Sequence, residues 1–539
     1  MTARPDPEHF DVVIVGYGPV GQVLASLLGR KGHRVAVFER FHDLYPLPRA
    51  VRLDGEVMRL LQNLQVIDDI DHELVAVGNY LWFGADGEVI LDIEIPPVHP
   101  SGWADSYLFH QPTLERALDR RARREPTVTV LQGWAVEHIA QVGAGDDGPV
   151  QLSARRVVPA GPGRVEPTDE TTTVSAPFVI GADGANSIVR NSAGISCTDF
   201  GFEESWLVVD FKPNDMNDFA HLPLASQRCD PARPVTVTGC GATQRRWEFM
   251  LVEGETAGDL EDTQRVWELL RGHASPDQGE LVRHAVYVFR SIVADTLRSG
   301  RMLVAGDAAH LMPPFMGEGM CSGIRDAANL AWKLDLVLSG TAPIELLDTY
   351  TSERLPQNMA TIAMSVEMGK VSCVRDREAA AGRDAAFRSG AVPPPPPLPL
   401  LHAGVIRRAT DVESDPLAGS KAVQGVIRDG SVEGRTDDVM GPGFSLMLGE
   451  GADPAAVLSS YQFELLGRLG VRIVVLDPSI PDGVHDVDGA LTAWMAAVGV
   501  VAVIIRPDHY VFGSARTLDV LPALVDELGV LIGVDPLQV

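Results

Sequence analysis

The sequence predicts an α/β fold in which a Rossmann-like nucleotide-binding domain is interleaved with a β-sheet domain and followed by a smaller C-terminal domain. A strand, a glycine-rich turn, a helix and a second strand fill residues 10–40. A mostly β block at 199–295 interrupts the alternation of strands and helices, which starts again near residue 430. Such alternation is typical of a sheet covered by helices, and an inserted β block is typical of a sheet that covers a substrate site.

The unit at residues 10–40 has the fingerprint of a dinucleotide site. A buried apolar strand at 12–15 runs into glycines at G-x-G-x-x-G spacing, and an amphipathic helix follows. The first glycine permits a tight turn, the second lets a pyrophosphate approach the backbone, and the third lets helix and strand pack closely. The N-terminus of the helix offers unpaired N–H groups to the phosphates. The residues of this turn are Gly16, Gly18, Pro19, Val20 and Gly21.

Charged residues next to this unit extend the prediction. Glu39 ends the second strand, eighteen residues after the last glycine, where it can accept hydrogen bonds from a ribose. Because strand, glycines, helix, strand and acid occur in order, we expect a nucleotide site and not a turn that binds nothing. Arg49 and Arg52 follow, and they are either solvated surface residues or cations that neutralise a pyrophosphate.

Composition and charge narrow the class of protein. The 539 residues suffice for two to four domains, and a formal net charge of −28 argues against nucleic acid or an anionic membrane as partner. The five cysteines form no C-x-x-C, which suits a reducing cytoplasm and predicts no metal site. The N-terminus lacks a secretory segment, and the uncharged run at 490–505 is short for a membrane span. We expect a helix, a turn and a buried strand there.

The remaining pattern sets the domain boundaries. We expect a β-hairpin around the Asp-Gly turn at 86–87 and a polar, exposed turn at 160–173. The prolines at 393–397 cannot join a helix or a sheet, so they predict an exposed connector. The predicted boundaries are 1–80, 106–198 and 296–375 for the nucleotide-binding domain, 81–105 and 199–295 for the substrate domain, 376–429 for a linker or lid, and 430–539 for the C-terminal domain.

Two further motifs lead to a family. Asp183–Gly184 lies within G-A-D-G-A-N-S-I-V-R, and Gly306–Asp307 lies within V-A-G-D-A-A-H-L-M-P-P. With the glycine turn, and in this order, they resemble the single-component FAD-dependent aromatic hydroxylases over residues 10–370. The third region is most similar to that of the 3-(3-hydroxyphenyl)propionate hydroxylases. The segment R-P-D-H-Y-V-F at 506–512 is similar to the thioredoxin-like C-terminal domain of many such enzymes.

The resemblance implies a role for each motif residue toward FAD. Arg49 would neutralise the pyrophosphate if the functional reading of its charge is correct. The other implied contacts are Glu39 and Arg40 at the ADP half, Gln111 beside the flavin, Asp183 at the ribose or pyrophosphate and at the NAD(P)H approach, Gly306 and Asp307 at the ribityl chain, and Pro313, Gly317, Gly319 and Met320 around the isoalloxazine.

The chain also departs from the family pattern. Many relatives have Asn two residues after the glycine that corresponds to Gly319, where this chain has Cys321. A side-chain contact to the flavin is lost there, and Cys321 is either a reactive thiol or a small buried filler. The C-terminal domain lacks C-x-x-C, which excludes thioredoxin redox chemistry and leaves packing or homo-oligomer formation as its role.

The resemblance further implies the reaction. NAD(P)H, for which NADH is our expectation, would visit transiently, because a second nucleotide fingerprint is absent. Reduced FAD would react with O2 to a C4a-hydroperoxide that hydroxylates an electron-rich ring, while the protein excludes water and orients the phenol. Catalytic residues are not assigned. The polar residues in or near the β block, each more often structural than substrate-binding, are His110, His221, Arg228, Arg233, Arg246 and His310. An arginine among them is the natural partner of a substrate carboxylate.

We therefore expect a cytoplasmic, NAD(P)H-using monooxygenase of aromatic catabolism that acts on a phenol of the 3-(3-hydroxyphenyl)propionate type. The alternative is a hydroxylase that tailors polycyclic secondary metabolites. An NAD-dependent dehydrogenase and a non-catalytic flavin-binding protein are weaker readings. A flavin halogenase is disfavoured because W-x-W-x-I-P is missing.

Overall fold

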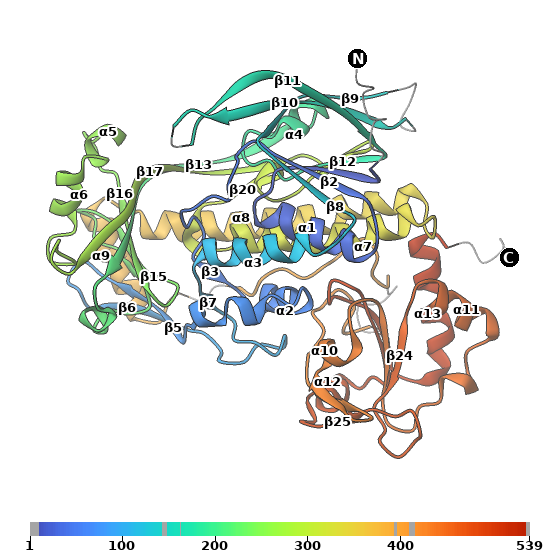
Figure 1. Cartoon of the computed structure of the whole chain (residues 1–539). Coiled ribbons are helices and arrows are strands. Elements are labelled where there is room, and N and C mark those ends of the chain that lie inside the picture. Colours follow the sequence, from blue (N-terminus) through green and yellow to red (C-terminus); the bar gives the residue numbers. More distant parts are fainter. Residues whose placement is uncertain (1–9, 143–147, 162, 393–395, 409–414, 535–539) are drawn as a thin grey trace.

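A central, mainly parallel sheet carries the predicted nucleotide-binding unit (Figure 1). The computed structural model describes residues 10–142, 148–161, 163–392, 396–408 and 415–534. The strands, in sheet order, are β18 (Arg298–Ser299), β19 (Met302–Val304), β12 (Phe178–Gly181), β1 (Val12–Val15), β2 (Val35–Glu39) and β8 (Val128–Gln132). Only β18 runs antiparallel to its neighbour among these described strands. β1 is buried along its whole length, as its continuous apolar run predicts.

Helices cover this sheet and bring three loops to one edge. α1 (Pro19–Arg30) packs against both α3 (Gln111–Arg123) and α7 (Gly319–Leu338). The carboxyl ends of β1, β12 and β19 lie side by side, because these strands are parallel neighbours. Ligands of open α/β sheets bind at this edge. The predicted glycine turn, the turn at 181–184 and the turn at 306–307 therefore meet there.

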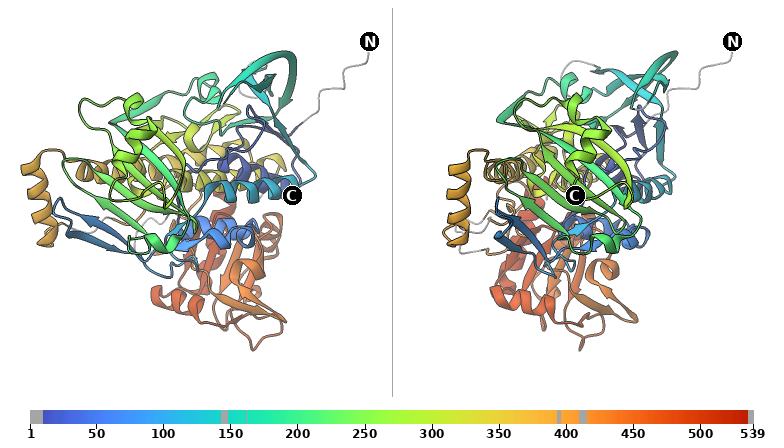
Figure 2. Two further views of the ribbon diagram at one scale, coloured as in Figure 1. Left: turned by 60° about the vertical axis from the view of Figure 1, so that its left-hand side comes forward. Right: turned by 90° about the vertical axis from the view of Figure 1, so that its left-hand side faces the viewer.

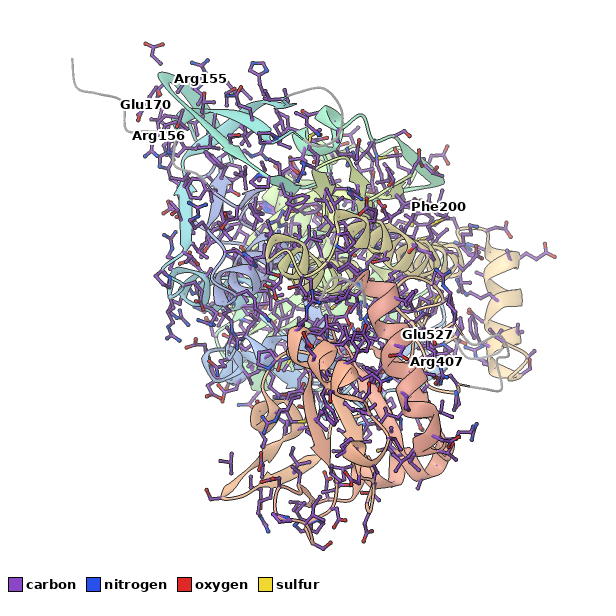
Figure 3. All side chains as sticks on the ribbon, turned by 90° about the vertical axis from the view of Figure 1, so that its right-hand side faces the viewer. Arg155, Arg156, Glu170, Phe200, Arg407 and Glu527 are labelled. Carbon is purple, nitrogen blue, oxygen red and sulfur yellow. The ribbon has the colours of Figure 1, made fainter. Side chains whose placement is uncertain are left out.

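A ribbon of three antiparallel strands extends from this domain, and one of them corrects a prediction. The strands are β9 (Trp134–Gln141), β10 (Val150–Pro159) and β11 (Val165–Ala176). We expected an exposed turn at 160–173, but most of that segment is β11, paired with β10. Its threonines favour a strand, yet it is exposed on both faces and therefore has no apolar alternation to reveal it. Figure 3 labels Arg155 and Arg156 of β10 and Glu170 of β11 in this ribbon.

The β block forms an eight-stranded sheet with two unlike faces. Its order is β20 (His310–Leu311), β17 (Gly279–Ala294), β13 (Cys197–Pro213), β16 (Gln244–Met250), β15 (Val235–Cys240), β14 (Ala225–Arg228), β5 (Asn79–Phe83) and β6 (Val89–Glu94). One face is apolar, with Phe211 and Trp247 at its centre, and packs against residues of α5 (Ala257–Leu260) and α6 (Thr263–Leu269). The opposite face carries Asp210 and Arg246, which lie beside each other across β13 and β16.

The remaining elements of the first 390 residues connect these sheets. β3 (Arg52–Leu53), β7 (Tyr107–Leu108) and β4 (Val75–Ala76) form a small sheet next to α2 (Gly55–Asn63). The short helices are α4 (Ile188–Ser192), η1 (Ile67–Asp69), η2 (Asp71–Glu73), η3 (Met216–Phe219), η4 (Gly306–Ala308), η5 (Pro314–Met316) and η6 (Ile344–Leu347). The long helix α8 (Asp348–Ser372) continues through Pro356. α9 (Arg377–Arg388), inside the predicted linker, packs on β6 (Figure 2). Its Phe387 ring lies 6.2 Å from that of Trp82.

The C-terminal unit contains two small sheets. β21 (Val426–Asp429) pairs with β22 (Val432–Arg435) and β25 (His485–Asp486), so the boundary at residue 430 falls within one hairpin. A second sheet has the order β24 (Arg472–Val475), β23 (Ser445–Leu448), β26 (Ala502–Ile505) and β27 (Val511–Ala515). Its helices are α10 (Thr436–Met440), η7 (Pro454–Ala456), α11 (Ser460–Arg468), α12 (Ala490–Val498), η8 (Leu518–Val520) and α13 (Leu521–Ile532). The β23-α11-β24-α12-β26-β27-α13 sequence is consistent with the predicted thioredoxin-like arrangement.

The connection to this unit is packed against it. Residues 393–395 of the proline run lie outside the described residues. Further on, Leu401 N donates to Gly419 O at 3.0 Å, and Arg407 approaches Glu527 of α13 at 3.4 Å (Figure 3). The run at 490–505 forms α12, a turn at Gly499 and β26, as expected. No helix in the described part of the chain is both long and apolar enough to cross a bilayer.

Candidate functional site

The glycine turn after β1 lies directly against the turn after β12. Ala182 N donates to Val15 O at 2.8 Å. A Cβ on Gly16 would overlap the carbonyl group of Ala182 and lie 2.9 Å from Asp183 Cα. Gly16 also has φ of +102°, which side chains rarely allow. Glycine is therefore required at this position both for the turn and for the contact between the two motifs.

The turn after β19 joins the other two. Ala305 N donates to Gly181 O at 2.9 Å. Gly306 approaches α1 so closely that its Cβ would lie 2.9 Å from Val20 Cγ2, and a Cβ on Gly323 of α7 would lie 2.7 Å from the same methyl group. The structure thus brings together three motifs that are widely separated in the sequence.

The first turn has the shape and polarity that the ADP half of FAD needs. Of the described residues, none lies within 4 Å of a Cβ placed on Gly18, so a phosphate can approach the backbone there. Gly18 is the N-cap of α1, and no side chain in the described structure caps it, which leaves N–H groups for an anion. Glu39 Oε2 accepts from Tyr17 N at 2.9 Å, so its carboxylate lies at the same turn. These residues fit the cofactor.

Asp183, Asp307 and Arg40 are three further residues that we predict to contact FAD. The Asp183 carboxylate accepts hydrogen bonds from Ser187 Oγ (2.6 Å) and Ile188 N (2.7 Å), and burial raises its pKa. Its contacts therefore hold the start of α4. Asp307 is exposed beside the joined turns, and Arg40 is exposed with its guanidinium 4.9 Å from the centre of the Phe41 ring. Their roles toward the cofactor stay predictions.

Gln111 fixes the backbone of the segment that precedes α2. Its Oε1 accepts from Arg49 N at 2.9 Å and from Ala50 N at 2.6 Å, while its Nε2 donates to Glu115 Oε1 at 2.6 Å. The Arg49 guanidinium is exposed and lies over the Tyr45 ring at 4.9 Å. Gln111 therefore holds residues 49–50 in place, and the guanidinium of Arg49 is accessible to a ligand.

The segment predicted to surround the isoalloxazine enters α7 through a tight turn. Pro313 is buried, and its carbonyl oxygen accepts from Ser365 Oγ of α8 at 2.6 Å. Gly317 has φ of +67°, and a Cβ there would lie 3.0 Å from Arg52 Cδ. Gly319 and Met320 begin α7, where the first N–H groups have no partner within the helix. The turn therefore presents backbone donors, as a flavin ring edge requires.

A buried ionic cluster supports this turn, and the sequence analysis singled out only part of it. Arg52 donates to Met316 O at 3.0 Å and pairs with Glu318. Arg325 of α7 pairs with Glu318 at 3.0 Å, with Glu56 at 2.8 Å, and with Asp54. These contacts match neither of our two hypotheses for Arg52, that it is a solvated surface residue or that it neutralises a pyrophosphate.

Cys321 lies in the same surroundings. Burial raises the pKa of its thiol well above the ordinary value, and the nearby Asp54 and Glu318 add to the rise. Its Sγ approaches Arg52 O at 3.7 Å. The thiol therefore stays protonated, which agrees with the reading of Cys321 as a buried filler.

A second buried cluster fixes the turn at Gly306. Asp326 Oδ2 accepts from Gly306 N at 3.1 Å and contacts His310 Nε2 at 2.7 Å, while Oδ1 accepts from Arg354 Nε at 2.9 Å. Burial raises the pKa of Asp326, but His310 and Arg354 outweigh it and lower the pKa to about 2. His310 is thus a satisfied structural residue. Asp326, Asn329 and Lys333 recur at helical spacing on the buried face of α7, a signal that could have revealed such networks.

The polar face of the eight-stranded sheet is tied to the Gln111 segment. Arg246 Nε donates to Asp210 Oδ1 at 2.7 Å, Nη1 donates to Arg49 O at 2.6 Å, and Nη2 donates to Pro48 O at 2.7 Å. Arg283 of β17 pairs with the other oxygen of Asp210 at 2.7 Å. Arg246 therefore connects the sheet to the proposed cofactor segment.

The other polar residues considered from sequence are scattered. His221 and Arg228 are exposed. Arg233 donates to Met250 O at 2.6 Å and pairs with Glu255 at 2.6 Å. His110 is the residue at the N-cap position of α3, and its Nδ1 lies 2.9 Å from Thr113 Oγ1. Among the six, Arg246 is the residue that donates to the carbonyl oxygens of residues 48 and 49.

Comparisons with known proteins agree with this geometry. The FAD binding domain family matches residues 9–365, and the HcaD C-terminal domain family matches residues 419–529. The chain is 38% identical to a probable NADH-specific resorcinol 4-hydroxylase of Rhodococcus jostii, over 96% of this chain and 94% of the relative. It is 33% identical to a 3-(3-hydroxy-phenyl)propionate/3-hydroxycinnamic acid hydroxylase of Mycolicibacterium smegmatis, over 94% and 91% of the two chains.

Solved structures share the whole architecture. The flavin-dependent monooxygenase PieE, in complex with FAD and substrate, superimposes with a TM-score of 0.80 at 21% identity over 98% of this chain and all of the other. Aklavinone-11 hydroxylase, with FAD and aklavinone, gives a TM-score of 0.77 at 24% identity with the same coverage. At such identities the likeness shows the fold. With the family match and the curated relatives, the three convergent turns show that this chain belongs to the FAD-dependent aromatic hydroxylases.

Proposed function

We propose that this protein uses NADH and O2 to hydroxylate a small, monocyclic phenol in the cytoplasm. One observation carries the proposal: three turns that fit FAD meet at one edge of the central sheet, and Arg246 ties the segment at 48–49 to the polar face of the eight-stranded sheet. The curated relatives support the substrate class, because their names specify a resorcinol hydroxylase that is NADH-specific and hydroxylases of a phenylpropionate.

Different residues of the chain would bind FAD, position the segment at 49–50 and orient the phenol. FAD, when bound, supplies hydride acceptance and oxygen activation. The backbone at Gly18 and the N-terminus of α1 bind its phosphates, and Glu39 binds its ribose. Gln111 holds residues 49–50. The eight-stranded sheet would exclude water from the flavin ring and orient the phenol. The contacts with FAD that we predict for the site residues are part of this proposal. The predicted boundaries of the FAD-binding and substrate domains are part of it as well.

The test follows reductant and product together. Purified protein that contains FAD is mixed with NADH or NADPH and a panel of resorcinol, 3-(3-hydroxyphenyl)propionate and fused-ring phenols. We expect NADH loss to be stimulated by a monocyclic phenol and to be matched by hydroxylated product. Turnover of fused-ring phenols alone would support the tailoring alternative, and a yellow protein that hydroxylates none of the panel would refute the proposal.

A further inference from the structure

Lys421 of the C-terminal unit reaches into the ionic cluster below the turn that enters α7. It lies within the match to the HcaD C-terminal domain family, at 419–529. Its Nζ lies 2.6 Å from Glu56 Oε2, and the same oxygen accepts from Arg325 Nε at 2.8 Å. Arg325 Nη1 donates to Glu318 Oε2 at 3.0 Å, and Glu318 is the N-cap of α7. Two side chains, Glu56 and Arg325, therefore link the C-terminal unit to the turn predicted to surround the flavin ring.

The charges of this cluster balance only when Lys421 is included. Within the described structure, its ion pairs connect three carboxylates to three cations, namely Asp54, Glu56 and Glu318 to Arg52, Arg325 and Lys421. Without the ammonium group, three buried carboxylates would share two guanidinium groups. A buried charge that has lost its partner is strongly unfavourable. Removal of Lys421 therefore forces the cluster to change its contacts or to take up a proton.

Glu318 is the acid of this cluster that most readily takes up a proton. Burial raises its pKa, whereas the pKa of Glu56 is lowered, because the effect of burial is outweighed by Lys421 and the other cation that it contacts. A protonated Glu318 would bind Arg52 less tightly. Arg52 donates to Met316 O at 3.0 Å, inside the turn. The loss of Lys421 should thus reach the backbone that faces the flavin.

A second contact of the C-terminal unit leads to the turn after β19. Tyr510 faces Lys421 across an isolated β-bridge, and its hydroxyl accepts from Gln357 Nε2 of α8 at 3.3 Å. Gln357 Oε1 accepts from Arg354, whose Nε donates to Asp326 Oδ1 at 2.9 Å in the cluster that fixes that turn. Residues of both sets of contacts border one small cavity at the junction. One place on the C-terminal unit therefore supports two of the three cofactor turns.

We propose that Lys421 is a positioning residue through which the C-terminal unit holds the turn at 313–320 in the shape that binds the flavin ring. The inference rests on the proposed function, because it assigns this turn to FAD. It gives the unit a role beyond the packing or oligomer formation that its sequence left open. Coupling between two sites is reciprocal, so FAD should in turn stabilise the contacts of the C-terminal unit.

Hydrogen exchange of the wild-type protein, with and without FAD, tests this reciprocity. We expect FAD to slow amide exchange about tenfold at 419–423 and 509–511, which face the junction. The internal control is α11, which packs on α13 and should not change. Protection of 313–320 by FAD without protection of either junction segment would overturn the inference. Exchange is read without turnover, so a protein that hydroxylates no phenol refutes the proposed function and still decides this inference.

Substitutions test the contact itself. Lys421→Met removes the charge from a side chain of similar length, and should both speed exchange at 313–320 and weaken FAD binding, each about tenfold. Adding Glu56→Gln restores the balance of charges and should recover most of both losses. Lys421→Arg, which keeps the charge, should behave nearly as wild type. A double variant that recovers nothing would overturn the inference.

A matched control separates positioning from general loosening of the junction. Asp437→Asn removes a charge from another ion pair between the C-terminal unit and α2, that with Arg59 at 2.6 Å. It should leave exchange at 313–320 and FAD binding unchanged, and effects equal to those of Lys421→Met would contradict the proposed role. If Lys421→Met does not fold, the exchange of the wild-type protein decides.

Discussion

Gly16 packs against Ala182, whereas Gly18, two residues further, faces open space. Both glycines belong to the same sequence motif, but the structure shows that they have different functions. The first allows two parts of the chain to touch, and the second allows a ligand to touch the chain. The position of Glu39 at this turn was predictable from its spacing to the glycines alone. The partners of Arg325 were not, because Asp54 and Glu56 approach it from α2 and the residue before α2.

The two glycines give a prediction at this scale. Gly16→Ala should lower the free energy of unfolding by about 2–4 kcal/mol, since its Cβ meets backbone atoms and its φ is strained. Gly18→Ala, with φ of −76°, should change the stability of the FAD-free protein by less than about 1 kcal/mol. It should weaken FAD binding about tenfold or more. Urea unfolding and FAD titration measure the two effects. Equal losses of stability in both variants would contradict the distinction.

At the scale of secondary structure, helices and strands with a strong hydrophobic periodicity were predictable from the sequence. β1, α1, β2 and α7 have strong periodicity, and the structure contains them close to the predicted ranges. β11 was missed because a strand that is exposed on both faces carries no apolar alternation. The attachment of β13 and β16 to the segment at 48–49 depends on tertiary packing, and Arg246 in the sequence gives no indication of its target.

That attachment can be weakened selectively. Arg246→Lys replaces a guanidinium that serves Asp210 and two carbonyl groups by a single ammonium, which cannot reach all three. We expect FAD to be retained, and product formation to fall about tenfold relative to NADH consumption because the ring and the phenol lose their alignment. The ratio of product to NADH consumed is the measurement. Arg233→Lys, whose partner is Glu255, is the control, and equal ratios in both variants would exclude this role.

Across the whole molecule, the C-terminal unit is joined to the FAD-binding domain by buried charges. Arg59 of α2 pairs with Asp437 at 2.6 Å, Arg506 pairs with Glu353 of α8 at 2.6 Å, and Lys421 pairs with Glu56 at 2.6 Å. Glu56 also binds Arg325 in the cluster below the cofactor turn. The absence of C-x-x-C still predicts that this unit has no thioredoxin-type redox chemistry, but the helices that it contacts could not be predicted from its sequence.

His509 makes this junction sensitive to acid. Burial, with Arg59 nearby, lowers the pKa of His509 from 6.5 to about 4. Between these values the unfolded chain binds a proton that the folded chain does not, so stability falls as the pH drops from 6.5 to 4, by at most about 3 kcal/mol. His509 has φ of +65°, which Asn tolerates, so His509→Asn keeps the backbone and should flatten this part of the pH profile. Urea unfolding at pH values from 8 to 4 measures how the free energy of unfolding depends on pH. If His509→Asn leaves that dependence unchanged, His509 is not its cause. His221→Asn, which makes the same change at an exposed site, is the control.

The charged junction also restricts how this enzyme can be recombined with its relatives. The partners of these ion pairs lie between 153 and 378 positions apart in the chain, so a chimera that exchanges only the residues after the proline run would combine charged residues that come from different enzymes. If α2 and α8 are exchanged together with the C-terminal unit, both partners of each of these three ion pairs come from the same enzyme. Hybrid enzymes built with that correspondence should express as soluble holoproteins, whereas those cut at the proline run alone should not.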